Sequence, residues 1–515
     1  MEVIAKAHHP RPGRRARTKS HSVDGGNRTY RSLRNTLSLQ RSFSDDEIAH
    51  IHETALQVLE RLGVRVLNDQ ARQHFAHAGA RVDPATMMVF IDRALVAQAL
   101  ATAPGEFMLG GAHLERDVRI GGDATAFMCV GGPPNISDID RGKRPGTLED
   151  FQNLVRLSQH FEVLHIQGSG VEPQDIPIEL RHLAQIETQL TLSDKPVFAY
   201  ARGAGQVSDV FEMVRLGRGI DAAAFAAKPW CYTVINTNSP RQLDNVMCQG
   251  IIDFARAGQL AVITPFTLAG AMAPITVAGA LTLQHAEALA GIVLAQLVNP
   301  GAPVVYGSFT SNVDMRSGSP AFGTPEFVRA AFGAGQLARH IGLPWRGSGA
   351  TASNAPDAQA AYEFLNSAWA GLLGGINMMI HAAGWLESGL TASLEKFVLD
   401  VEMLQVLAEV LQDNHRDMDG LFEAIAEVEP GGHFFGSQHT MARYEKAFYT
   451  PLVSDWRNFG AWSEDGSRTA TERANGIWKK VLEHFEPPPL DVARKDAIAA
   501  FRERRAREGG APIPA

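Results

Sequence analysis

Short apolar runs recur along the middle of the chain, and stretches with helical spacing separate them. Seven runs begin at intervals of roughly 30 to 43 residues, each bounded by Gly, Pro, Asn or Ser. They lie at residues 163–168, 196–201, 231–236, 260–264, 303–308, 343–347 and 376–382. Nearly continuous apolar strands that alternate with amphipathic helices predict a parallel sheet covered by helices on its outer face.

The number of units predicts how this sheet is arranged. An eighth strand is predicted near residues 433–437, where the sequence reads HFFGS. Eight strand–helix units that close on themselves form a (β/α)₈ TIM-type barrel, which the length of 515 residues accommodates. An open doubly wound sheet is the alternative, and it is disfavoured because no GxGxxG turn follows any of the runs.

The rest of the chain divides around this barrel. The stretch from Ser44 to Gly63 has an N-cap serine, acidic residues in its first turn and apolar residues at helical spacing, so it predicts a helix. Arg14 and Arg15 form a basic pair, but no hydrophobic segment of an export signal follows them. The predicted parts are a disordered basic tail (1–40), an N-terminal mixed α/β segment (41–156), the barrel (157–490), and a C-terminal helix with a loose tail (491–515).

Composition narrows the function. A net charge of -8 argues against nucleic acid as the main partner, and the apolar runs stay below the roughly 20 residues of a membrane span. Cys129, Cys231 and Cys248 are far apart and form no CxxC motif, which is typical of a reducing, cytoplasmic compartment. Whether the chain forms a homo-oligomer stays open.

Active residues of such a barrel lie at the carboxyl ends of the strands and in the loops that follow. Aromatic residues gather there: Tyr306, Phe309, Trp345 and Trp385. A quaternary ammonium cannot donate a hydrogen bond, so its site uses ring faces, and these four are candidates for substrate binding. Packing inside the barrel is the alternative for each ring taken alone.

The charged candidates are few. Glu287 lies in a predominantly apolar helix, where a carboxylate without a partner is costly to bury, so it is the predicted catalytic acid. His285 and Glu287 form an HxE pair with no third ligand, so no metal site is predicted. Arg346 could bind a substrate carboxylate, or form an ion pair with Asp357 or Glu363. Asp357 could contact substrate or serve as a helix N-cap.

Several longer segments carry a resemblance to a known family. They read EIAHIHETALQVLERLGVRV, AGALTLQHAEALAGIVLAQLVNPGAPVVYGS, GSPAFGTPEF, GLPWRGSG, PDAQAAYE and GWLESGLTASLEKFVLD, and they occur in one order. Through them the chain resembles the trimethylamine methyltransferase family from about Phe43 to Phe485. The resemblance implies a (β/α)₈ barrel that moves a methyl group from a methylamine to the cobalt of a corrinoid protein.

One position separates this chain from the founding members of the family. Those members carry pyrrolysine in the loop that here reads GATASNAPD, and its place corresponds to about Thr351. Threonine cannot form an adduct with trimethylamine, so the chain resembles the branch without pyrrolysine, whose substrates are quaternary amines such as glycine betaine. Thr351 is therefore a further candidate for substrate binding.

The same resemblance implies the partner. The methyl acceptor would be a cobalamin (corrinoid) carried by a separate protein, because this chain has no DxHxxG motif to ligate cobalt. A non-catalytic barrel that binds a small molecule, or an assembly subunit, is the alternative from another class.

Overall fold

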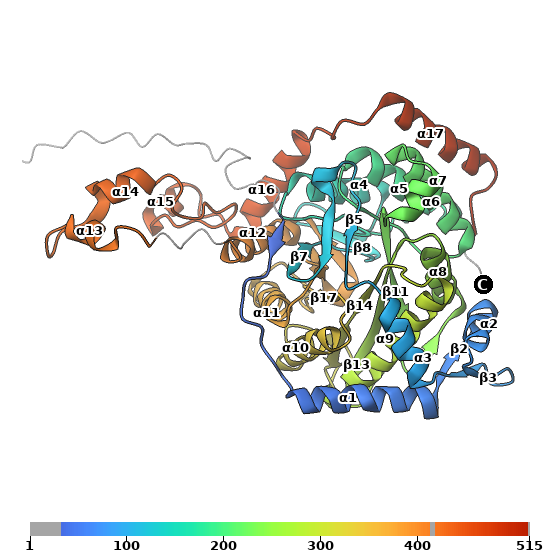
Figure 1. The fold of residues 1–515 in the computed structure, drawn as a ribbon. Coiled ribbons are helices and arrows are strands. Elements are labelled where there is room, and N and C mark those ends of the chain that lie inside the picture. The colour runs from blue at the N-terminus through green and yellow to red at the C-terminus, as the bar shows by residue number, and fades with distance from the viewer. Residues whose placement is uncertain (1–31, 413–417, 513–515) are drawn as a thin grey trace, which may run out of the picture.

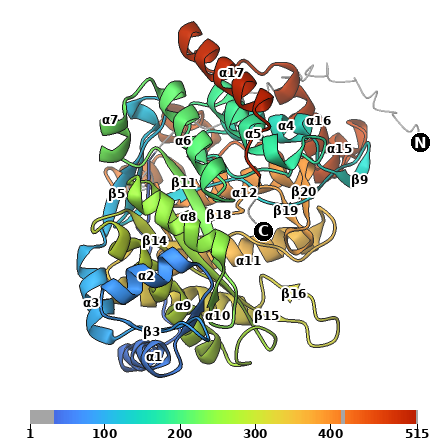
Figure 2. The same cartoon turned by 90° about the vertical axis from the view of Figure 1, so that its right-hand side faces the viewer.

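The computed structural model describes residues 32–412 and 418–512, and its centre is a curled, mostly parallel sheet wrapped by helices (Figures 1 and 2). Seven strands are parallel to their neighbours in this order: β7 (Ala124–Phe127), β18 (Met378–Ile380), β17 (Trp345–Ser348), β14 (Val304–Gly307), β13 (Leu260–Ala269), β11 (Cys231–Thr237) and β10 (Val197–Phe198). The strand β15 (Phe309–Val313) also runs beside β13 and pairs with β16 (Pro320–Ala321). The predicted α/β class with a parallel sheet is therefore confirmed, while the closure of eight strands into a TIM-type barrel stays a prediction.

Six of the seven predicted strands lie where the apolar runs place them. The run at 163–168 makes a single parallel bridge, Met128 to Ile166, instead of a strand. Side-chain acceptors here replace the backbone carbonyls that would accept in a regular parallel sheet. The Phe127 amide donates to His165 Nδ1, and the Gly168 amide donates to Cys129 Sγ. Two backbone bonds still connect this segment to both sides, from His165 N to Phe127 O (2.9 Å) and from Gln167 N to Pro196 O (3.0 Å).

The prediction of an eighth strand near residues 433–437 is wrong. Phe434–Gly436 forms a short 3-10 helix (η4) far from the sheet, and both phenylalanines of HFFGS are exposed. The sheet instead contains β7, from the run ATAFMCV, which predicts a strand but was assigned to the N-terminal segment and not to the barrel. A strand of one part can pair with a distant one because pairing depends on tertiary contact, to which local sequence contributes little.

Helices cover the convex face of the sheet, where the larger hydrophobic core lies. Those that follow the strands are α5 (Ile178–Leu192), α6 (Ala204–Arg218), α7 (Ala222–Ala227), α8 (Asn245–Arg256), α9 (Val277–Val298), α10 (Pro325–His340), α11 (Ala358–Gly374) and α12 (Leu394–Val410). Of the helices in the described residues, α9 is long and apolar enough to cross a membrane, but 72% of its most apolar window is buried inside the protein. It packs against β13 and against α8, so it is a core helix.

The concave face of the sheet holds a second, smaller core. Because alternate residues of a strand point to opposite faces, Tyr232, Val262, Val305 and Met378 lie together on this side. The hairpin of β5 (Glu106–Leu109) and β6 (Val118–Gly121) adds Leu109, Val118 and Ile120 to the same cluster. The hairpin therefore closes the amino end of the curl, opposite the end at which β15 and β16 lie (Figure 2).

Residues before β7 form a layer against the outer helices. Ser44 caps α1 (Asp45–Gln57) with a capping box that uses Glu47, and the helix continues as a π-helical turn (η1, Val58–Leu62) to Gly63, as predicted. Further elements before β7 are β2 (Val64–Val66), α2 (Asp69–His77), β3 (Arg81–Asp83), β4 (Met88–Phe90), α3 (Arg93–Thr102) and η2 (Leu114–Arg116). The strand β12 (Gln242–Leu243), which follows β11, pairs in parallel with β2, and the helix α4 (Leu148–His160) comes after β7 and packs on α5. The predicted basic tail lies outside the described residues up to residue 31, while Leu33–Arg34 forms β1 on β7.

A small second sheet and the last helices complete the fold. The sheet has the order β19 (Trp385–Leu386), β20 (Thr391–Ser393), β8 (Asn135–Asp138) and β9 (Gly142–Pro145), with η3 (Glu387–Gly389) between its first two strands. After α12 the chain projects away from the body through α13 (Leu421–Ala426), α14 (Gln438–Arg443) and α15 (Phe459–Glu464) (Figure 1). It returns as α16 (Ala470–Glu483), which packs on α12, and α17 (Val492–Arg507), which packs on α6.

Candidate functional site

Arg346 on β17 is a deeply buried charge. It is 1% exposed, and within residues 32–412 and 418–512 it forms no ion pair with a carboxylate. Its Nη1 donates to the carbonyl of Ser308 (3.2 Å), while its Nε finds no acceptor among the described residues. Burial lowers the pKa of Arg346 to about 9. A buried cation without a counter-ion is costly, so this position suits an anionic ligand.

One aromatic ring lies beside the guanidinium, and further rings pack on that ring. The Arg346 Cζ lies 5.2 Å from the centre of the Phe309 ring, a cation–π distance. Phe309 stacks on Phe322 with ring centres 5.2 Å apart and meets Trp385 at 6.2 Å. We call Phe309, Phe322, Arg346, His381 and Trp385 the Arg346 cluster.

His381 brings no second charge to the Arg346 cluster. Its ring lies 3.8 Å from that of Trp385, and its Nδ1 shares a hydrogen bond of 2.9 Å with the Ser348 hydroxyl. Burial, together with the nearby Arg346, holds the pKa of His381 well below its usual range. A neutral imidazole beside a lone guanidinium leaves the cluster with one net positive charge.

The indole of Trp385 is a second donor without an acceptor. Its Nε1 is buried and makes no hydrogen bond in the described residues, as is the case for Arg346 Nε. Both side chains contact Phe309, so the two unpaired donors belong to one place. Buried donors are nearly always paired in native proteins, and two unpaired ones indicate a site for an acceptor-bearing ligand.

Thr351 holds the loop after β17 and does not present its hydroxyl to the Arg346 cluster. Its Oγ1 donates to the backbone carbonyl of Trp385 (2.6 Å), and the Ser388 amide donates to its own carbonyl (3.2 Å). Glu363 of α11 accepts the next two amides, those of Ala352 and Ser353 (2.8 and 2.9 Å). These bonds tie the loops after β17 and β18 together, so Thr351 positions Trp385 through its backbone.

A buried ion pair holds the other side of the same loop. Asp400 of α12 accepts the Gly384 amide (2.8 Å) and pairs with Lys396 one turn earlier, and all three groups are buried. Burial raises the pKa of Asp400 to about 6 and lowers the pKa of Lys396. Gly384 has φ +90°, which favours glycine in the turn between His381 and Trp385.

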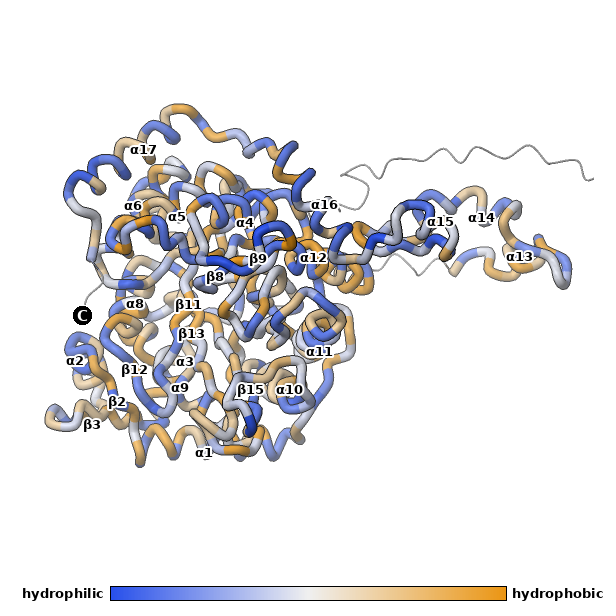
Figure 3. The backbone as a smooth tube through the Cα atoms, turned by 180° about the vertical axis from the view of Figure 1, so that it is seen from behind, coloured by the Kyte–Doolittle hydropathy of each residue, from blue (hydrophilic) through white to orange (hydrophobic). Residues whose placement is uncertain are grey.

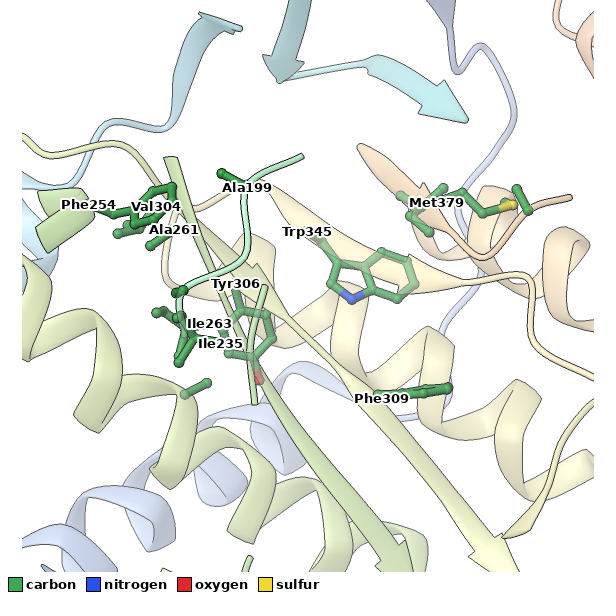
Figure 4. Close-up of a cluster of buried hydrophobic side chains, with 14 of the residues drawn as sticks. Ala199, Ile235, Phe254, Ala261, Ile263, Val304, Tyr306, Phe309, Trp345 and Met379 are labelled. Carbon is green, nitrogen blue, oxygen red and sulfur yellow. The ribbon is translucent and has the colours of Figure 1, made fainter. Parts of the chain in front are cut away.

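Tyr306 and Trp345 face the helices, on the convex side of the sheet. The Tyr306 hydroxyl bonds with His285 Nδ1 (2.9 Å) and Gln284 Oε1 (3.1 Å), both on α9. The Trp345 ring packs on Gly335 of α10 and Gly374 of α11, where an added Cβ would meet it at 3.2 and 2.8 Å. Figure 4 shows Tyr306 beside Ile235 and Ile263, apart from Phe309. Their part in substrate binding stays a prediction.

Asp357 and Glu287 also lie away from the Arg346 cluster. Asp357 is exposed and caps α11 by accepting the Ala360 amide (3.2 Å). Glu287 of α9 is buried and accepts from Thr237 Oγ1 (2.5 Å), Ser239 Oγ (2.6 Å) and the Arg241 amide (2.7 Å). Burial raises the pKa of Glu287 despite these three bonds. The carboxylate thus fixes the loop that follows β11, and its catalytic role stays a prediction.

The two roles of Glu287 predict different behaviour of Glu287→Gln. The amide keeps the shape and can bond all three groups, because the hydroxyls of Thr237 and Ser239 can also accept. For a positioning residue we expect kcat within about 5-fold of wild type, whereas loss of a general acid or base lowers kcat about 100-fold or more. Glu287→Ala serves as the comparison, since it removes both the charge and the loop contacts. Steady-state kinetics that show equal losses for Gln and Ala would contradict the positioning role.

Phe322, Ser348 and His381 were not singled out by sequence reasoning. His381 ends the apolar run 376–382 and lies at a strand end, but a single histidine there gives no periodic signal. It does have a positive φ of 56°, which is uncommon for a residue other than glycine and is visible only in the backbone. Phe322 follows Pro320 in a loop whose path to Phe309 depends on the β15–β16 hairpin. No group of three metal-ligating side chains exists in the described part of the chain.

Fold and cluster together define an α/β protein with a buried, cationic and aromatic candidate ligand site at the carboxyl ends of its central strands. The model of the trimethylamine methyltransferase (MTTB) family matches residues 10–510. The chain therefore belongs to this family, and it is a methyltransferase.

Two relatives by sequence agree with this assignment. The chain is 36% identical to a glycine betaine methyltransferase of Desulfitobacterium hafniense (strain Y51), over 91% of this chain and 97% of the relative. It is 31% identical to the trimethylamine methyltransferase MttB of Desulfitobacterium hafniense (strain DSM 10664 / DCB-2), over 87% and 90% of the two chains. Among solved structures, the monomethylamine methyltransferase MtmB of Methanosarcina barkeri is 10% identical with a TM-score of 0.47, covering 88% of this chain and 95% of that one.

Proposed function

We propose that the protein takes a methyl group from the quaternary ammonium of a betaine, a zwitterion with its own carboxylate, and passes it to the cobalt of a corrinoid protein. The observation that carries this proposal is Arg346, buried without a counter-ion among aromatic rings. The relative at 36% identity is a glycine betaine methyltransferase, which supports the same substrate class.

The Arg346 cluster matches both ends of such a substrate. A carboxylate can accept two parallel hydrogen bonds from a guanidinium, and it would supply the counter-ion that Arg346 lacks. The quaternary ammonium would lie against the faces of Phe309 and Trp385. No carboxylate of the described residues is part of the cluster, so the charge that balances the ammonium must come from the substrate. Choline brings a cation and no carboxylate, and the lone Arg346 would repel it.

Loop movement is part of this proposal. Arg346 is nearly inaccessible, so a substrate reaches it only when the loops after β17 and β18 move apart. On closing, the aromatic rings would replace water around the ammonium, and the Thr351 bond to the Trp385 carbonyl would restore the ring to its place. Exclusion of water removes the hydration shell from the reacting C–N bond and fixes its direction.

The chemistry requires no proton from the chain. When the C–N bond breaks, its electron pair stays on nitrogen and the product is a neutral tertiary amine. A corrinoid held by the partner protein would supply the electron pair that accepts the methyl group. A neutral His381 and the absence of an acid within the described cluster are consistent with this, and the residues bind and orient the substrate.

We also infer that the curled sheet closes into a complete eight-stranded barrel through residues 164–168. The bridge from Met128 to Ile166 and the bond from Gln167 N to Pro196 O connect β7 with β10 through this segment. Closure would gather all strand ends at one opening, and the partner would dock there over the Arg346 cluster.

Methyl transfer can be measured directly. Purified protein is mixed with cob(I)alamin and one of glycine betaine, a longer betaine, choline or trimethylamine, and methylcobalamin is followed by its absorbance. We expect product from at least one betaine and at least 10-fold less from choline and trimethylamine. Binding of a betaine with no transfer to free cobalamin or to any corrinoid protein would overturn the methyltransferase proposal in favour of a binding protein.

A further inference from the structure

The turn η3 follows Trp385 almost directly and has an unusual backbone. Its three residues all have a positive φ, of 52° at Glu387, 51° at Ser388 and 99° at Gly389. A left-handed backbone is costly for residues other than glycine, and it persists only where the surrounding structure fixes it. Two such residues in succession indicate that the neighbours of the turn hold it in this shape.

Backbone and side-chain bonds join the turn to two other loops of the site. The Glu387 amide donates to the Ser353 carbonyl (2.8 Å). The Ser388 amide donates to the Thr351 carbonyl (3.2 Å), in the same loop after β17. The Ser388 hydroxyl donates to the Pro320 carbonyl of β16 (3.0 Å). The turn therefore cannot shift without breaking bonds to both loops.

An ion pair holds the outer side of the turn. Lys143 of β9 donates to both carboxylate oxygens of Glu387 (2.7 and 2.5 Å), and Thr391 Oγ1 donates to Glu387 Oε2 (2.6 Å). The strand β9 is mostly exposed and hydrophilic (Figure 3). The turn is thus tied to the surface of the protein as well as to the loops of the site.

Gly389 brings the backbone of this turn against the indole of Trp385. A Cβ added to Gly389 would lie 2.5 Å from Cζ2 and 2.6 Å from Cη2 of the indole, far inside van der Waals contact. The same indole contacts His381 and Phe309, with ring centres 3.8 and 6.2 Å apart. A methyl group at Gly389 would force either the turn or the indole to move. Because the turn is held by its bonds, the indole is the part that moves.

We propose that Gly389 is a specificity-determining residue, which sets how far the Trp385 indole stands from Phe309 and thereby the size of the ammonium group that the site accepts. The inference rests on the proposed function, in which the ammonium lies against these two rings. Moved away from the turn, the indole enters the space that the Arg346 cluster offers to a ligand. Gly389 acts through the ring, so it is a positioning residue.

Binding of two betaines that differ by one methylene group tests the proposal. Glycine betaine and its analogue with one N-ethyl group share the charge and the carboxylate, and calorimetry with the full-length protein measures both Kd values without methyl transfer. One methylene can change affinity for a tight pocket roughly 10-fold or more, so Gly389→Ala should raise the Kd of the N-ethyl analogue about 10-fold more than that of glycine betaine.

Gly301→Ala is the matched control for backbone strain. Gly301 also has a positive φ, of 89°, but no heavy atom lies within 4 Å of an added Cβ. This variant should therefore leave the ratio of the two Kd values unchanged. An equal change of the ratio in Gly301→Ala and Gly389→Ala would overturn the proposal.

A double variant covers the case in which Gly389→Ala misfolds. Trp385→Phe removes the benzo edge of the indole, including Cζ2 and Cη2, and so makes room for the methyl group. Gly389→Ala/Trp385→Phe should fold and show the same ratio of Kd values as Trp385→Phe alone. An unchanged ratio in Gly389→Ala, or a double variant that fails to recover, would overturn this inference and leave the proposed function standing. A wild type that binds neither betaine would overturn both.

Discussion

Replacing Arg346 by methionine is expected to lower kcat/KM for glycine betaine about 100-fold. Methionine fills a similar volume without the charge, so the substrate carboxylate would lose its partner and its hydrogen bonds. A buried charge-assisted pair contributes roughly 3 kcal/mol, which corresponds to this factor. Choline has no carboxylate, so its rate should change by less than about 5-fold or even improve. Methylcobalamin formation with both substrates gives the comparison.

The neighbouring residue supplies the matched control for Arg346. Trp345→Phe lies on the same strand but faces α10 and α11, so it should affect both substrates alike and by less than about 10-fold. Arg346→Lys should be intermediate, because an ammonium offers a point charge and no planar fork. Equal losses for glycine betaine and choline in Arg346→Met would contradict the carboxylate role, and a strong loss in Trp345→Phe would support the predicted part of Trp345 in binding.

Replacing Asp400 by asparagine is expected to lower the free energy of unfolding by about 3 kcal/mol. The substitution leaves Lys396 buried without its counter-charge, and losing one partner of a buried pair typically costs roughly 3–5 kcal/mol. Asparagine can still accept the Gly384 amide, so the loss reports mainly on the charge. Urea unfolding followed by circular dichroism measures the change.

A double variant distinguishes the ion pair of Asp400 from its hydrogen bond to the Gly384 amide. Lys396→Met/Asp400→Leu replaces the pair by apolar side chains of similar size and should recover most of the stability. It cannot hold the Gly384 amide, so the turn that carries Trp385 should loosen and the KM for glycine betaine should rise. An Asp400→Asn variant as stable as wild type, or a double variant less stable than the single one, would refute the importance of the buried pair.

The strands were predictable because parallel strands buried on both faces leave nearly continuous apolar runs. The run 260–264 is the start of β13, and the run 303–308 contains β14. The strand predicted at 433–437 is wrong for the same reason. HFFGS contains an apolar pair, although its phenylalanines are exposed between α12 and α16. Apolar composition alone therefore does not tell whether a segment lies in a buried sheet or on the surface.

The site could be predicted only in part, because strand residues alternate between two faces that are both buried. Arg346 and Trp345 are adjacent, and nothing in the sequence says which of them points to the concave side. Phe309, Arg346 and Trp385 were predicted, and Arg346 and Trp385 both contact Phe309, whereas Tyr306 faces α9. The hydrogen bonds of Asp400 and Glu363 each join a helix to the loop before it, at separations of 16 and 11 residues, so the helical and strand periodicities do not reveal them.

The hairpin of β5 and β6 has a kinetic consequence. It closes the amino end of the curl, so in the proposed reaction the open end must serve both as the entrance for the small substrate and as the landing area for the methyl acceptor. Because the small substrate and the methyl acceptor would use the same opening, they cannot bind in random order. The amine must bind before the acceptor protein binds, and the demethylated product can dissociate only after the acceptor has dissociated. Saturating acceptor should therefore slow turnover at low amine concentration, a pattern of substrate inhibition that a passage through the far end would abolish.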